Sequence, residues 1–174
     1  MTQRVELSSK RMDYGTPLDL FEKLNNVYNF DLDVAASDEN HLCKAYFTEK
    51  FSALDSKCWN TRAFCNPPYG RQLPKFVAKA IEIVNQYDKN GNHTGPKCVV
   101  FLIPARVGSR WFQELVFDSA TAVLFLKGRL AFQGESNSAP FDSCIVEYST
   151  QPFGSRLGGV QLEGKYFELD WTKF

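Results

Sequence analysis

The segment Arg62-Ala63-Phe64-Cys65-Asn66-Pro67-Pro68-Tyr69 predicts a short strand that ends abruptly in a rigid loop. Two adjacent prolines stop both helix formation and sheet pairing, so the strand ends before Pro67. The loop therefore lies at the carboxyl end of a strand, where open α/β sheets place their ligand crevices. The rigid Pro67-Pro68 backbone fixes the carbonyl oxygens of Asn66 and Pro67, and the Asn66 amide oxygen is a further acceptor beside them.

This loop suits a planar group that carries an exocyclic amine. Its oxygens match the N–H bonds of such an amine, and Tyr69 supplies a flat ring for stacking. The structural alternative is an ordinary turn with a capping Asn at position 66.

The elements around this loop alternate between strands and helices, which predicts an α/β fold with a mostly parallel central sheet flanked by helices. Thr16 suits a helix N-cap and Pro17 the first helical position. Apolar residues at helical spacing predict helices after Pro17, over 73–87 and over 109–117. Uninterrupted apolar runs at 98–103 and 122–126 are typical of strands buried on both faces. Further strands are expected near 30–36, 45–48, 130–132 and 144–148.

The domain organisation is expected to be simple, because 174 residues suit one folded domain. Polar residues 1–13, with Arg4, Lys10 and Arg11, predict a flexible basic N-terminal arm. The folded domain is expected over residues 14–150. Residues 151–174 are expected to form a C-terminal extension packed on the core, with a hairpin around Gly164.

The charges are balanced overall but unevenly distributed. Twenty Lys and Arg oppose twenty Asp and Glu, which argues against nucleic-acid binding by bulk positive charge. Residues 60–112, however, hold eight basic and two acidic side chains, a local net charge of +6 around the double-proline loop. This region is either an ordinary solvated face or a phosphate-contacting surface beside a site.

The five cysteines form no C-x-x-C pair, and His41 and His93 lie far apart, so no metal site is expected. Buried free thiols in a reducing compartment fit this pattern. The N-terminus lacks the apolar core of a signal peptide, and no apolar run is long enough to cross a bilayer. We therefore expect a cytoplasmic protein that binds no membrane.

The ordered motifs of the chain resemble those of the phage-type DNA N-6-adenine methyltransferase (Dam) family. The resemblance covers about residues 14–148, most of the chain. The matching segments are Tyr14-Gly15-Thr16-Pro17, Leu32-Asp33-Val34-Ala35-Ala36, Ala45-Tyr46-Phe47-Thr48, Cys65-Asn66-Pro67-Pro68-Tyr69-Gly70-Arg71, Leu102-Ile103-Pro104-Ala105-Arg106, Arg110-Trp111-Phe112, Lys127-Gly128-Arg129-Leu130-Ala131-Phe132 and Asn137-Ser138-Ala139-Pro140-Phe141.

The resemblance implies a Rossmann-like S-adenosylmethionine-dependent methyltransferase fold over residues 14–150. The implied reaction moves the methyl group of S-adenosylmethionine to the exocyclic N6 of a flipped-out adenine in duplex DNA and leaves S-adenosylhomocysteine. The implied location is the cytoplasm of a bacterial host. Implied catalytic residues are Asn66, Pro67, Pro68 and Tyr69, and implied cofactor contacts are Tyr14, Thr16, Pro17, Asp33, Ala35, Ala36 and Asn66. DNA contacts are predicted from Arg71, Lys75, Arg106, Arg110 and Arg129, which lie near the loop in sequence or in matched segments.

Two other interpretations stay open from the sequence. The methyl acceptor could be another amine, such as cytosine N4, an RNA base or a protein glutamine. Alternatively, the chain could be a non-catalytic DNA-binding module that keeps the loop as a relic. The sequence predicts no oligomeric state and no recognition site.

Overall fold

The computed structural model describes residues 14–57, 59, 62–150 and 164–173. Within them, seven strands form one sheet in the order β2-β1-β3-β4-β6-β5-β7. The strands are β1 (Leu32–Asp33), β2 (Ala45–Tyr46), β3 (Arg62–Cys65), β4 (Cys98–Pro104), β5 (Ala122–Leu126), β6 (Ser143–Ser149) and β7 (Tyr166–Leu169). The helices are α1 (Leu18–Tyr28), α2 (Leu73–Val84) and α3 (Arg110–Phe112), with a 3₁₀ turn at Ala53–Asp55 and a π-helical turn at Gln113–Phe117.

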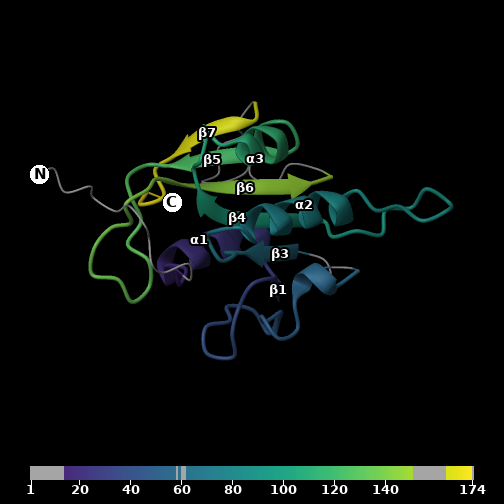
Figure 1. Cartoon of the computed structure of the whole chain (residues 1–174), viewed down its shortest axis with the longest axis horizontal. Coiled ribbons are helices and arrows are strands. Elements are labelled where there is room, and N and C mark those ends of the chain that lie inside the picture. Colours follow the sequence, from purple (N-terminus) through teal and green to yellow (C-terminus); the bar gives the residue numbers. More distant parts are fainter. Residues whose placement is uncertain (1–13, 58, 60–61, 151–163, 174) are drawn as a thin grey trace, which may run out of the picture.

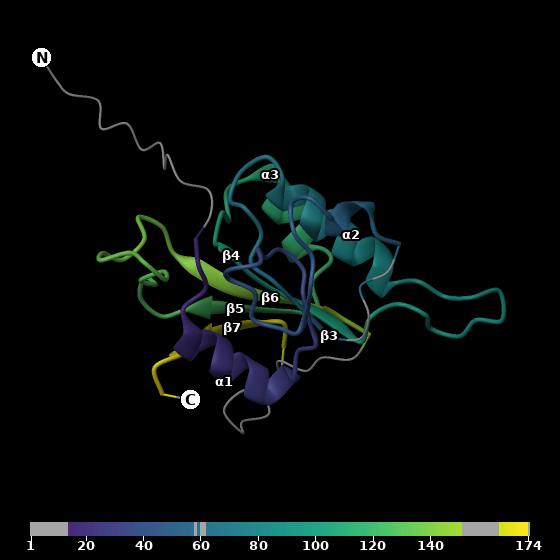
Figure 2. The same ribbon diagram turned by 90° about the horizontal axis from the view of Figure 1, so that it is seen from below.

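The helices cover both faces of the sheet. Figure 1 shows the strands side by side, and Figure 2, turned by 90°, shows α1 on one side of the sheet with α2 and α3 on the other. This arrangement confirms the predicted α/β class. The helix expected over 109–117 is instead a short α3 that continues as the π-helical turn, and no strand forms at 130–132.

The prediction of a mostly parallel sheet is wrong, because the sheet is mixed. β2, β1, β3 and β4 pair in parallel, and so do β5 and β7, but β6 runs antiparallel to both β4 and β5. The reason is the connection between β5 and β6. Residues 127–142 form a loop without a helix, and strands joined in this way return antiparallel, because a parallel return needs a crossover.

The core lies on both faces of the two central strands. All seven residues of β4 are buried, and so are six of the seven in β6. α1 adds an apolar face of Leu20, Phe21, Leu24 and Tyr28. This helix ends at Asn29, whose left-handed backbone (φ 53°) stops the helix.

The N-cap of α1 differs from the expectation. Pro17, not Thr16, occupies the N-cap position, and no side chain caps the helix. The Thr16 hydroxyl contacts Asn66 instead. The first-turn N–H groups of α1 are therefore not satisfied by a capping side chain.

The predictions for the two ends of the chain fall largely on residues outside the described ones. Residues 1–13 and 151–163 are among these. Of the C-terminal extension, the described part contains β7, which pairs in parallel with β5 at the edge of the sheet. None of the helices in the described part has the length and apolar character needed to span a bilayer.

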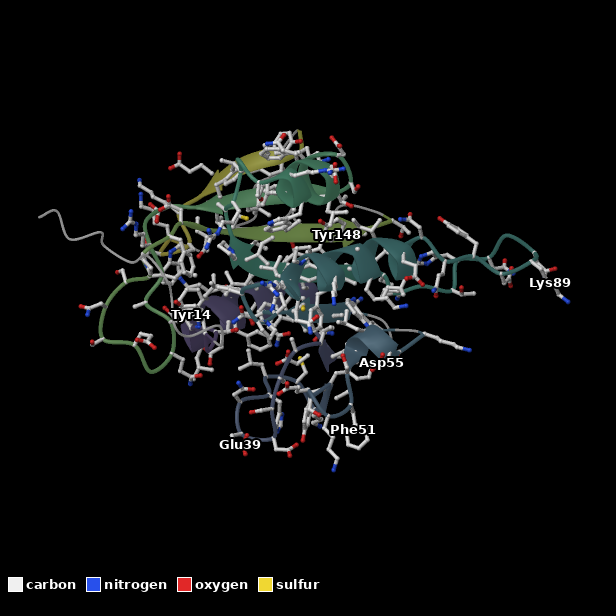
Figure 3. All side chains as sticks on the ribbon, viewed as in Figure 1. Tyr14, Glu39, Phe51, Asp55, Lys89 and Tyr148 are labelled. Carbon is white, nitrogen blue, oxygen red and sulfur yellow. The ribbon has the colours of Figure 1, made fainter. Side chains whose placement is uncertain are left out.

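Several connections meet at one edge of the sheet. Because β1, β3, β4 and β5 point the same way, the segments that follow them emerge at their shared carboxyl edge. The N-terminus of α1 also lies there, since Thr16 contacts Asn66 just after β3. The loop after α2, with Lys89 at its tip, projects from the opposite end of the molecule from Tyr14 (Figure 3).

Candidate active site

The centre of the site is the side-chain amide of Asn66. Its Nδ2 donates hydrogen bonds to the carbonyl oxygen of Tyr14 at 2.6 Å and to Thr16 Oγ1 at 2.9 Å. A carbonyl oxygen only accepts, so the nitrogen of the amide must face Tyr14, and Oδ1 must point away from it. These two hydrogen bonds therefore set the orientation of the amide, with Nδ2 toward residues 14–16 and Oδ1 on the other side.

Asn66 Oδ1 is buried and accepts no hydrogen bond from any described residue. A buried acceptor without a donor costs about 1–3 kcal/mol, and such atoms are rare in folded proteins. Ser143 Oγ, at the start of β6, and Arg62 Nε are the other unpartnered buried side-chain atoms in the described residues. Asn66 Oδ1 is thus a buried acceptor for which the described residues supply no donor.

Four aromatic rings pack against one another, and one of them belongs to Tyr14, which contacts the Asn66 amide. The Tyr14 ring lies 5.3 Å from Tyr69, 4.9 Å from Phe132 and 5.5 Å from Phe141, measured between ring centroids. Tyr69 also contacts Phe132 at 6.0 Å and Phe141 at 5.6 Å. These four rings are called the aromatic cluster below. The cluster thus packs around Tyr14, the residue whose carbonyl oxygen holds the Asn66 amide.

Tyr69 is fixed within the cluster. Its side chain is 8% exposed, and its hydroxyl donates to the Leu102 carbonyl oxygen at 3.3 Å. Burial raises the pKa of Tyr69 well above its ordinary value, so the phenol stays protonated. The tyrosine therefore acts as a ring and a hydrogen-bond donor, and not as a base.

Asp33 ends β1 on the strand beside β3. It is 3% exposed, and its carboxylate accepts hydrogen bonds from the backbone N–H of Leu42 at 3.1 Å and of Ala35 at 3.4 Å. Burial raises the pKa of Asp33, and these two hydrogen bonds oppose the rise. Asp33 thereby shapes the loop that follows β1, in which Ala35 and Ala36 are half-buried.

The predicted DNA-contacting residues are all exposed, and they lie in segments that follow strands at the carboxyl edge. Arg71 and Lys75 begin the α2 region after the double-proline loop, and Arg106 follows β4. Within the described part of the chain these three make no ion pair, whereas Arg110 pairs with Glu114 at 2.6 Å and Arg129 with Asp142 at 3.5 Å. Arg71, Lys75 and Arg106 are thus exposed cations without an ion pair to any described residue.

The sequence interpretation missed Phe132, Phe141 and Gln133 as site residues. Both phenylalanines lie in segments that match the family, Phe132 within the strand expected at 130–132, but nothing local shows that they meet Tyr14 and Tyr69. Gln133 donates its backbone N–H to the Gly15 carbonyl oxygen at 2.8 Å. A side chain at Gly15 would lie 2.9 Å from Gln133 Cβ, so this close approach favours glycine.

No group of three or more His, Cys, Asp or Glu side chains in the described residues is arranged to hold a metal ion. The groups at the candidate site are instead amide and carbonyl oxygens, which accept hydrogen bonds, the first-turn N–H groups of α1, which donate them, and aromatic rings. This set fits an organic ligand with an amine and an anionic group.

The fold and the site together define an α/β protein with an oriented, buried amide acceptor directly after β3, at the carboxyl edge of its sheet. The comparison with known families is more specific. Residues 5–147 match the DNA N-6-adenine-methyltransferase (Dam) family, and the chain belongs to this family. The resemblance predicted from the motifs is confirmed.

One relative is a DNA N-6-adenine-methyltransferase of Escherichia phage T1. It is 30% identical to this chain over 127 residues, which cover 71% of this chain and 48% of the relative. The chain spans about half the length of that relative.

Proposed function

We propose that the chain methylates the exocyclic N6 of adenine in duplex DNA, with S-adenosylmethionine as the methyl donor. Membership of the Dam family supports the reaction class. The observation that carries the proposal is the buried Asn66 Oδ1, which accepts from no described residue, because a methyltransferase of this kind needs an oriented acceptor for the substrate amine. The phage origin of the relative supports action in the cytoplasm of a bacterial host.

The chemical task of Asn66 follows from the electronic structure of adenine. The lone pair of N6 is conjugated into the ring and is therefore a weak nucleophile. Hydrogen bonds from the amine to Asn66 Oδ1 and to the Pro67 carbonyl oxygen favour a pyramidal nitrogen, which frees the lone pair. The same oxygens stabilise the positive charge that develops on the nitrogen as it gains a methyl group. Pro68 keeps the two acceptors in place.

The residues around Asn66 fit the cofactor. S-adenosylmethionine supplies an electrophilic methyl group when it is bound. The uncapped first turn of α1, which begins after Pro17, suits the carboxylate of its methionyl group. Ala35 and Ala36 allow close approach of a ligand to the backbone after β1, and Asp33 holds that loop in shape. Tyr14 and Thr16, directly before α1, both contact Asn66, which supports a cofactor site adjacent to the acceptor.

An adenine within a duplex cannot reach a buried acceptor, so we propose that the target base is flipped out of the helix. The Tyr69 ring would stack on the base in exchange for one of its present ring contacts in the aromatic cluster. Stacking of a base on an aromatic ring contributes about 1–3 kcal/mol, which offsets part of the cost of flipping. Arg71, Lys75, Arg106, Arg110 and Arg129 are proposed to contact DNA phosphates around the site.

The experiment is methylation of matched substrates by the purified chain. Unmethylated duplex DNA, RNA and protein are incubated with S-adenosylmethionine carrying a labelled methyl group, and the products are digested and analysed by mass spectrometry. We expect N6-methyladenine from DNA. N4-methylcytosine, methylated RNA or methylglutamine would replace the proposal with one of the other acceptors, and absence of cofactor binding in calorimetry would indicate a relic.

Two asparagine variants test the role of Asn66 within this assay. Asn66→Ala should lower turnover by about 100-fold or more, since it removes an oriented group that stabilises the transition state. Asn85→Ala is the matched control, because Asn85 lies at the far end of α2, where its amide bonds the Ile81 carbonyl oxygen. An Asn66→Ala protein with near-normal turnover would disprove the acceptor role.

A further inference from the structure

We infer that Thr16 is a positioning residue for methyl transfer, because its hydroxyl holds the Asn66 amide with Oδ1 turned toward the substrate amine. This inference rests on the proposed function. It assigns Thr16 a different task from the cofactor contact that the family resemblance implies. The evidence is the pair of hydrogen bonds that link Asn66 to the segment before α1.

The Asn66 amide group is held at two points. An amide nitrogen carries two N–H bonds, and the two acceptors in segment 14–16, the Tyr14 carbonyl oxygen and Thr16 Oγ1, use both of them. The Tyr14 carbonyl oxygen sets which end of the amide faces segment 14–16. An Oδ1 in that position would be repelled, so Nδ2 lies there and Oδ1 points the other way. A single hydrogen bond would still leave the amide free to pivot about it. The second bond, to Thr16, removes this freedom and fixes the direction of Oδ1.

The position of the Thr16 hydroxyl is itself well defined. Thr16 is 6% exposed, so water does not compete readily for its hydroxyl. A threonine is stiff at χ1, and the next residue, Pro17, restricts the backbone. The hydroxyl is also not used to cap α1. The side chain therefore has one described task, which is to accept from Asn66 Nδ2.

The test compares Thr16→Val, which keeps the shape but loses the hydroxyl, with Thr16→Ser, which keeps the hydroxyl. The single-turnover rate of DNA methylation is measured at saturating DNA and S-adenosylmethionine, and cofactor affinity is measured by calorimetry. We expect Thr16→Val to slow the rate about three- to tenfold, as for loss of one neutral hydrogen bond. Thr16→Ser should restore most of the rate, and both variants should bind cofactor with nearly normal affinity.

Thr121→Val is the matched control for loss of a threonine hydroxyl. Thr121 Oγ1 donates to the Ser149 carbonyl oxygen at 3.0 Å and accepts from the Ser149 N–H at 2.9 Å, at the edge of the sheet opposite Asn66. This variant should lower the melting temperature but leave the saturated rate unchanged. If Thr16 had only a structural role, Thr16→Val would likewise lower the melting temperature and leave the saturated rate unchanged.

The outcomes separate the inference from the proposed function. If the wild-type protein forms no N6-methyladenine, the proposed function fails and the inference fails with it. If the wild type is active and Thr16→Val has the same saturated rate, only the positioning role is overturned. If Thr16→Val loses cofactor affinity while its saturated rate is normal, Thr16 is a cofactor contact instead.

Discussion

The hydroxyl of Tyr69 donates a hydrogen bond to the carbonyl oxygen of Leu102, in the middle of β4. This bond ties the double-proline loop to the neighbouring strand through a side chain. It engages the edge of the tyrosine and leaves the faces of its ring to other aromatic groups. The two properties of Tyr69, its ring and its hydroxyl, can therefore be separated by substitution.

Tyr69→Phe removes the hydrogen bond to Leu102 and keeps the ring. We expect it to lower the free energy of unfolding by about 1 kcal/mol and to change methylation by only a few fold. Tyr69→Ala also removes the stacking surface, so it should weaken the handling of a flipped base by about 1–3 kcal/mol. The measurement is the fluorescence of 2-aminopurine at the target position. Equal signals from the alanine variant and the wild type would contradict a stacking role.

Tyr28 and Tyr148 form a second pair for comparison, within the core. Tyr28 donates to the carboxylate of Glu147 at 2.9 Å, whereas Tyr148 donates to the neutral Leu115 carbonyl oxygen at 2.6 Å. Tyr28→Phe should cost about 1.5–3 kcal/mol and Tyr148→Phe about 0.5–1.5 kcal/mol, because bonds to charged acceptors are stronger. Urea unfolding measures both. A larger cost for Tyr148→Phe would contradict this ranking.

The basic residues near the site should contribute to DNA binding according to whether they are already paired. Arg106→Ala should weaken binding similarly for all sequences and reduce the slope of log affinity against log salt by about 1, as for loss of one phosphate contact. Arg110→Ala should have a smaller effect, because Glu114 already engages this guanidinium. Fluorescence anisotropy over a salt series measures the slopes.

Lys89→Ala is the control for these basic residues. Lys89 lies at the tip of the loop that projects away from the site (Figure 3). Its removal should leave affinity and salt slope unchanged. An effect of Lys89→Ala as large as that of Arg106→Ala would move the DNA-binding surface to the opposite end of the protein.

The buried thiols should be inert in the folded protein. Cys43, Cys65, Cys98 and Cys144 are free and buried, and burial raises the pKa of Cys43 and of Cys98 to about 12. Their thiolate fraction near pH 8 is therefore very small, and the thiolate is the reactive form. In a Cys58→Ser protein, Ellman's reagent should label no thiol quickly until guanidinium unfolds the chain, after which it should label all four. Fast labelling of one thiol in the folded state would contradict this burial.

The parts of the fold that sequence predicts are those with a local physical cause. The double proline at Pro67 and Pro68 ends β3 wherever the rest of the chain lies. The unbroken apolar run 98–103 indicates burial on both faces of a strand, and β4 is buried throughout. Apolar spacing likewise predicts α2, although its helical bounds end at Val84 rather than at residue 87.

The direction of β6 has no such local signal. A run such as Cys144-Ile145-Val146 is equally apolar read in either direction, so composition reports burial and not orientation. The deciding feature is the absence of a helix in residues 127–142, which the prediction of a strand at 130–132 obscured. The two-residue strands β1 and β2 are also set by pairing with distant residues rather than by their own sequence.

The candidate site also combines residues that their local sequence predicts with contacts that only the folded chain shows. Asn66 and Tyr69 were predicted from the chemistry of their own loop. The contact of Thr16 with Asn66 joins residues 50 positions apart, and the aromatic cluster joins three separate segments. Pairings of this kind depend on the folded topology, so a single sequence can supply the participants but not their partners.

The backbone bridge between Gly15 and Gln133 links the segment that aims Asn66 to the loop 127–142. A displacement of this loop that kept the bridge intact would carry Gly15 and its neighbour Tyr14 with it. Because the Tyr14 carbonyl oxygen accepts from Asn66, such a displacement would also turn the Asn66 amide. Under the proposed function, the position of the loop and the alignment of the acceptor would thus be linked through one glycine.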